Sequence, residues 1–150
     1  MITRIHKSMQ EKDKGFTLIE LLVVMIIIGI LAAIAIPVFL NQRKKAEDTA
    51  AKADVSTIGK EVATYYVDNA DDASLAISQS GTPAHYFLTG AGAPTPGTDL
   101  GRSSNNVVLG TATNLGNSQG WCVMVTDPKG DKAVTGFKYS AAGGLEEGGC

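Results

Sequence analysis

A run of twenty residues without a charge, Leu21 to Leu40, constrains what this chain can fold into more than any other feature. As an α-helix the run would be about 30 Å long, which matches the hydrocarbon core of a bilayer. A soluble domain of 150 residues has too little surface to cover a helix that is apolar on all sides. The sequence therefore predicts a span that contacts lipid at some stage, in preference to a buried core helix.

The flanks of this span do not set its orientation, because four basic residues precede it and four follow it. The long polar C-terminal part favours export of that part, since long domains translocate largely regardless of charge. Small residues late in the run leave ordinary signal-peptide cleavage open. The residues concerned are Arg4, Lys7, Lys12 and Lys14 before the span, Arg43, Lys44, Lys45 and Lys52 after it, and Ala32, Ala33 and Ala35 within it.

One acidic residue, Glu20, lies immediately before the uncharged run. A carboxylate near the start of a membrane span costs free energy, less at the interface than at the centre, and such residues are usually functional. Glu20 is therefore a candidate functional residue. The alternative is an interfacial side chain that only reaches back to water.

The residues around Glu20 form a specific pattern, Lys14-Gly15-Phe16-Thr17-Leu18-Ile19-Glu20, which follows a short charged segment and precedes the apolar run. This pattern resembles the class III signal of type IV prepilins. The ending, YSAAGGLEEGGC, resembles the C-termini of pilins from Gram-positive bacteria such as actinobacteria. The resemblance implies an α+β type IV pilin fold, in which a long N-terminal helix exposes its apolar half as a stalk and packs its other half on an antiparallel sheet of three or four strands.

In such prepilins a membrane peptidase cuts after the glycine, here Gly15, and methylates the new first residue, here Phe16. Residues 1–15 would then be a leader, and residues 16–42 the transmembrane and filament-core helix. The new amine would lie at a helix end that already carries positive charge, so a carboxylate nearby is favourable. We expect Glu20 to pair with a Phe16 amine, mainly that of a neighbouring subunit. Gly29 and Pro37 are expected to weaken the helix.

The resemblance implies a structural subunit of a type IV pilus, a helical homo-oligomer outside the cell. Its expected partners are a prepilin peptidase that is also an N-methyltransferase, a platform protein and, indirectly, an assembly ATPase. Before assembly the prepilin would lie in the cytoplasmic membrane with its head outside. A pseudopilin of a type II secretion or DNA-uptake system is the first alternative, and a monomeric membrane-anchored binding module is the second. Roles in cell adhesion or twitching motility stay open.

Residues 43–150 are expected to form a globular head. An amphipathic helix is predicted at 43–70, a loop at 71–105 with a short strand or turn at 85–89, and an antiparallel sheet at 106–140 followed by a tail at 141–150. The predicted strands are 106–112, 120–126 and 133–140, and the second is expected to be central. The apolar stripe of the helix consists of Ala51, Val55, Ile58, Val62, Tyr65 and Tyr66, with the charged residues, Asp48 and Asp54 among them, mostly off this face.

Cys122 and Cys150 are the only cysteines. In an exported chain the even count predicts one disulfide, which would tie residues 141–150 to the sheet, with free thiols or an intermolecular bridge as the alternatives. No catalytic motif or metal-ligand pattern is present, so we expect neither an enzyme nor a cofactor or metal. Asp68–Asp72 lacks the alternation of a calcium loop. A net charge of −2 gives no indication of nucleic-acid binding.

Overall fold

The computed structural model describes residues 15–70 and 72–150, so the expected leader, apart from Gly15, lies outside the described residues. One helix, α1 (Leu18–Asp68), continues through Gly29 and Pro37. The chain divides into two compact units between Phe39 and Leu40. We call residues 15–39 the stalk and residues 40–150 the head, and describe each by itself.

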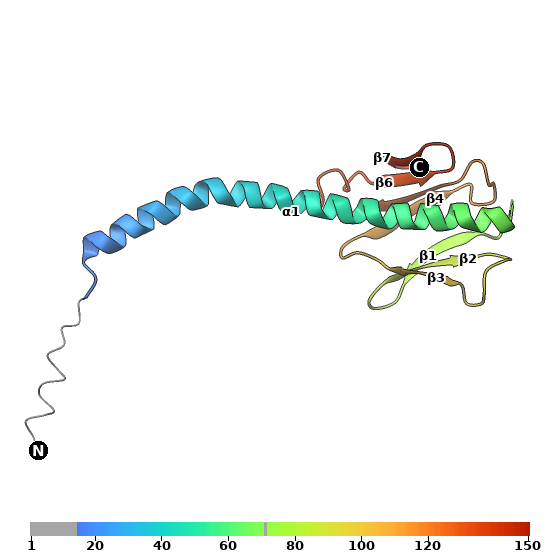
Figure 1. The fold of residues 1–150 in the computed structure, drawn as a ribbon, viewed down its shortest axis with the longest axis horizontal. Coiled ribbons are helices and arrows are strands. Elements are labelled where there is room, and N and C mark those ends of the chain that lie inside the picture. The colour runs from blue at the N-terminus through green and yellow to red at the C-terminus, as the bar shows by residue number, and fades with distance from the viewer. Residues whose placement is uncertain (1–14, 71) are drawn as a thin grey trace, which may run out of the picture. The chain divides into compact units, whose positions relative to one another are not determined.

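The head combines the second half of α1 with two antiparallel sheets (Figure 1). The first sheet has three strands in the order β1-β2-β3 and the second has four in the order β4-β5-β6-β7. The whole is an α+β pilin-like fold, as the sequence predicts. The strands are β1 (Ala76–Ser80), β2 (His85–Thr89), β3 (Thr98–Arg102), β4 (Val108–Thr113), β5 (Cys122–Thr126), β6 (Phe137–Ser140) and β7 (Gly144–Glu147).

The prediction of a loop at 71–105 was wrong beyond the short strand at 85–89, because this segment contains the whole first sheet. Only β2 alternates between partly and fully buried residues, while the residues of β1 and β3 are exposed or at most partly buried. Such edge strands have little pattern of their own and depend on pairing with β2. The tail also contains a strand, β7, which pairs with β6. The last expected strand starts only at Phe137, after Gly136 with φ 106°.

The core of the head lies between α1 and the sheets. Val55, Ile58 and Val62 of the predicted helix stripe are fully buried, whereas Tyr65 is only partly buried. They pack with β5, which is flanked by β4 and β6 as expected and contributes the fully buried Val123 and Val125. Burial of such side chains contributes about 1.5–3 kcal/mol each, so this stripe holds the helix on the sheets.

Two acidic residues expected mostly off the buried face of α1 are buried. The Asp48 carboxylate accepts hydrogen bonds from the backbone N–H groups of residues 131–133, at 2.9–3.2 Å. Burial raises the pKa of Asp48, but these hydrogen bonds outweigh it and hold the pKa below its usual value. Asp54 accepts the Tyr86 hydroxyl at 2.9 Å and the Ser104 backbone N–H at 2.8 Å. Each carboxylate therefore fastens α1 to a distant loop or strand.

The side chain of Gln79 on β1 connects the two sheets by hydrogen bonds. Its amide nitrogen donates to the Val107 carbonyl at 2.9 Å, and its amide oxygen accepts from the Leu109 N–H at 2.8 Å. This amide makes the two hydrogen bonds that a neighbouring strand would make to the edge of β4. The edge of β4 is thereby partly satisfied without a paired strand.

Gly59, in the middle of the helix, is required by packing. A Cβ atom at this position would overlap the ring of Tyr139 and lie 2.7 Å from the Tyr139 Cβ. Tyr139 in turn stacks on Trp121, with ring centroids 6.0 Å apart. The base of a side chain cannot swing away without moving its strand, so glycine permits this close approach of α1 to β6.

We expect Gly59→Ala to destabilise the head, although alanine favours a helix by about 1 kcal/mol. Overlap with Tyr139 should outweigh this gain and leave a net loss of about 2 kcal/mol. Denaturant unfolding of the full chain, followed by the fluorescence of Trp121, the single tryptophan, measures the change. Combining Gly59→Ala with Tyr139→Ala should cost less than the sum of the two single losses. Additive losses, or a stabilised Gly59→Ala, would show that the overlap is not decisive.

Candidate functional site

The candidate site is the stalk, which contains the described part of the predicted motif and the apolar run up to Phe39. Every residue from Gly15 to Leu40 is exposed except the partly buried Ala32. Phe16 is 87% exposed, and an 18-residue window in α1 has a mean hydropathy of 3.1 with none of it buried. By length and composition this part of α1 can cross a membrane. An apolar surface of this size requires lipid or another protein to cover it.

The first turn of α1 is closed by a capping box formed by Thr17 and Glu20. The Glu20 carboxylate accepts the Thr17 backbone N–H at 2.8 Å and the Thr17 hydroxyl at 2.7 Å, while the Glu20 N–H donates to the Thr17 hydroxyl oxygen at 3.3 Å. The spacing Thr-x-x-Glu before an apolar run is the sequence signature of this arrangement, although the role predicted for Glu20 did not include it. Within one chain Glu20 thus has a local role in starting the helix.

The capping contacts use only one of the two carboxylate oxygens. Both hydrogen bonds from Thr17 end on Oε2, and Oε1 of Glu20 accepts none from the described residues. A carboxylate oxygen has two lone pairs, so Oε1 can accept a hydrogen bond from an ammonium without loss of the cap. Oε1 is therefore available as an acceptor for the predicted partner of Glu20, the amine of Phe16.

Contacts among residues 15–70 and 72–150 do not explain three of the predicted residues. Cβ atoms at Gly15 and Gly29 would meet no atom within 4 Å, and neither glycine has a positive φ. Pro37 lies inside α1, which continues on both sides of it. Proline removes one backbone hydrogen bond there. No contact within the described residues therefore requires glycine at position 15 or 29.

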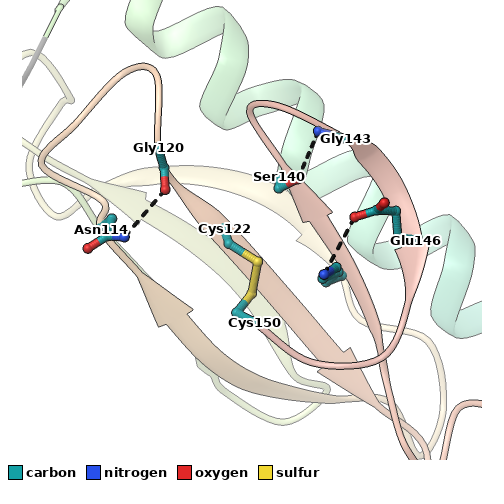
Figure 2. Close-up of a disulfide and its surroundings, with 8 residues drawn as sticks. Asn114, Gly120, Cys122, Ser140, Gly143, Glu146 and Cys150 are labelled. Atoms are coloured by element: carbon teal, nitrogen blue, oxygen red, sulfur yellow. Dashed lines mark hydrogen bonds and ion pairs between the residues drawn. A yellow bond between two sulfur atoms is a disulfide. The ribbon is translucent and has the colours of Figure 1, made fainter.

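The predicted cysteine pair lies at the other end of the sequence. Cys122 and Cys150 form a disulfide with an S–S distance of 2.02 Å, joining residue 150 to the start of β5 (Figure 2). The tail before Cys150 folds back as β7. Two ion pairs connect β7 to the preceding segments, Lys132–Glu147 at 2.5 Å and Lys138–Glu146 at 3.5 Å. The bridge closes the tail onto the second sheet.

The acidic segment after α1 closes a turn of the head. Asp72 accepts the Tyr65 hydroxyl at 2.5 Å, the Ser74 backbone N–H at 2.8 Å and the Ala91 N–H at 2.7 Å. The Ser74 and Tyr65 hydrogen bonds hold the pKa of Asp72 well below its usual value. Asp71 lies outside the described residues. Over 15–70 and 72–150, no group of three or more His, Cys, Asp and Glu side chains is placed to hold a metal.

Comparison with known proteins finds similarity in the N-terminal part of the chain. The family model described as the prokaryotic N-terminal methylation motif matches residues 11–36. Type II secretion system core protein G of Pseudomonas aeruginosa is 40% identical over 60 residues, which are 40% of this chain and 42% of that protein. The type IV wide pilus major component of Thermus thermophilus is 41% identical over 81 residues, 51% of this chain and 62% of that protein.

A fimbrial protein of Eikenella corrodens is 61% identical over 36 residues, which cover 24% of this chain and 23% of that protein. The chain thus spans less than two thirds of the length of each of these relatives. No solved structure matches the chain significantly. The motif with its apolar helix and the arrangement of helix and antiparallel sheets agree with one another and support a type IV pilin-like protein.

Proposed function

We propose that this chain is a structural subunit of a type IV pilus, which polymerises through its stalk into an extracellular filament. The observation that carries the proposal is an apolar helix that none of the described residues covers, together with the methylation motif at its start. In the membrane this surface would contact lipid, and in a filament it would contact other copies of the same helix. Both surroundings are apolar, so transfer between them costs little hydrophobic free energy.

Glu20 then decides the axial register of assembly. In a dry filament core an unpaired carboxylate or ammonium costs several kcal/mol. Pairing Glu20 of one subunit with the Phe16 amine of its neighbour removes both costs at once, and only one axial offset permits it. The free Oε1 of Glu20 supports this role.

The proposal places the precursor in the cytoplasmic membrane with its head outside, and the mature chain in the extracellular filament. It requires a prepilin peptidase that methylates Phe16, a platform protein and an assembly ATPase. The similarity of the chain's ending to Gram-positive pilins stays a prediction that none of these relatives tests.

A pseudopilin of a type II secretion or DNA-uptake system is the second candidate, favoured by the similarity to the core protein G of type II secretion. Both candidates use the same stalk and motif, so processing does not separate them. Electron microscopy of surface filaments, present in the parent strain and lost when the gene is deleted, would favour the pilus. Normal filaments with loss of protein secretion would favour the pseudopilus.

We expect cleavage between Gly15 and Phe16. Intact-mass analysis of assembled material should give a chain that starts at Phe16 and is one methyl group heavier. Gly15→Val should remain uncut, because a branched side chain obstructs approach of a protease to the backbone, whereas Gly29→Ala is a matched control that should be cut normally. Assembled chains that start at Met1 would contradict the proposed cleavage. A chain found only as a membrane-bound monomer, starting at Met1 or after the alanines near Ala35, would support the membrane-anchored module.

A further inference from the structure

We propose that the residues just beyond the apolar run form a basic collar that binds the headgroups of anionic phospholipids in the leaflet facing the head. The collar comprises residues 41–46, with the sequence Asn-Gln-Arg-Lys-Lys-Ala. The inference rests on the membrane stage of the proposed function.

The collar is the stretch of helix whose side chains belong neither to the apolar run nor to the buried core of the head. All six of its residues are exposed, whereas Glu47 is partly buried and Asp48 is buried in the head. Six helical residues span about 9 Å, comparable with the headgroup layer of one leaflet, about 5–8 Å. Chain connectivity alone keeps the Cα atom of Arg43 within about 11 Å of that of Leu40, the last residue of the apolar run. The collar therefore coincides in depth with lipid phosphates.

The three cations of the collar have no acidic partner within the described residues. The ion pairs there are His85–Asp99, Lys132–Glu147 and Lys138–Glu146, and none includes Arg43, Lys44 or Lys45. The nearest acids along the helix are Glu47, which makes no ion pair with them, and Asp48, whose carboxylate is occupied by backbone N–H groups. These three side chains are free to bind phosphate.

Charge in the head is strongly segregated. The collar carries three basic residues and no acid, whereas residues 46–150 contain six basic and twelve acidic residues, a formal charge of −6. An anionic membrane surface attracts the collar and repels the rest of the head, within a Debye length. The complementary partner of the collar is therefore an anionic headgroup, and the contact holds the acidic head away from the bilayer.

The test uses the full chain reconstituted in phosphatidylcholine vesicles that contain spin-labelled phosphatidylglycerol or spin-labelled phosphatidylcholine. Electron paramagnetic resonance measures which labelled lipid is immobilised at the protein. Substitution of the collar cations, R43Q/K44Q/K45Q, should lower the preference for phosphatidylglycerol by about threefold or more. The matched control, K60Q/R102Q/K129Q, removes the same charge from exposed head positions and should leave the preference unchanged. Salt should weaken the preference of the wild type.

If both triple variants lose the preference for phosphatidylglycerol equally, the net charge of the protein and not the collar determines the preference, and the proposal fails. An unchanged lipid preference in the collar variant, with loss of filaments in cells, would overturn it in favour of contacts between copies. If alkaline buffer removes the wild-type protein from the vesicles, the protein is not inserted in the bilayer. That result would overturn the membrane stage of the proposed function and the collar with it. A firmly inserted wild type without preference for phosphatidylglycerol would overturn the collar alone.

Discussion

Replacing Glu20 by glutamine is expected to reduce filament yield by more than about tenfold while processing continues, because the neighbour's Phe16 ammonium would be left unpaired in a dry core at a cost of several kcal/mol. Cleavage takes place before assembly, so the two steps should separate in this variant. Removing a charge from the edge of the span also makes membrane insertion no worse. The measurement compares mature chain in membranes with chain in sheared filaments.

The capping box makes glutamine a sharper choice than alanine. Glu20 accepts two hydrogen bonds from Thr17, and alanine would remove this cap along with the charge, at a cost of about 1 kcal/mol. Glutamine at this position still serves a capping box but carries no charge. Thr17→Ala is the complementary control, because it removes the capping hydroxyl and leaves the Glu20 carboxylate in place.

We expect Thr17→Ala to be cut and to assemble nearly as well as the wild type. Glu20→Asp should give a partial defect, since the charge remains but its reach is shorter. If Glu20→Gln assembles normally while Thr17→Ala does not, the residue acts by starting the helix and the pairing proposal fails. Normal assembly of both variants would leave Glu20 as an interfacial side chain.

Loss of the Cys122–Cys150 bridge is expected to destabilise the head by about 3.5 kcal/mol, because it frees a segment of the unfolded chain that the bridge closes. The cysteines are 28 residues apart, and the tail between β6 and Cys150 is held otherwise by β7 and two ion pairs. Ion pairs at exposed positions contribute at most about 1 kcal/mol each. The tail should therefore loosen first when the bridge is absent.

Denaturant unfolding of the full chain, monitored at Trp121, measures this loss, because Trp121 is 3% exposed and stacks on Tyr66 and Tyr139. A reductant should lower the midpoint of the wild type and leave a Cys122→Ser/Cys150→Ser variant unchanged. Peptide mapping under non-reducing conditions provides the control for the pairing. Two free thiols in the mature chain, or equal midpoints with and without reductant, would contradict the expectation.

Local patterns in the sequence were sufficient for the stalk and for the buried stripe of the helix. The uncharged run Leu21–Leu40 can be recognised from residues that are adjacent in the sequence. The same is true of the motif that contains Gly15, Phe16 and Glu20. The stripe of Val55, Ile58 and Val62 follows the helical period, and the apolar β5 has the character of a central strand. Such features are readable because one helix or one strand by itself determines which side chains share a face.

The partners of the head residues were decided only by the tertiary structure. Asp48 is buried because three N–H groups, 83 to 85 residues away, converge on its carboxylate. Gly59 likewise has its reason in a distant residue, Tyr139, and Gln79 has its partners at the edge of β4. The first sheet forms because β1 and β3 pair with the half-buried β2. The cost of burying a charge, or of placing glycine in a helix, is visible in the sequence, whereas the contact that offsets it exists only after the chain has folded.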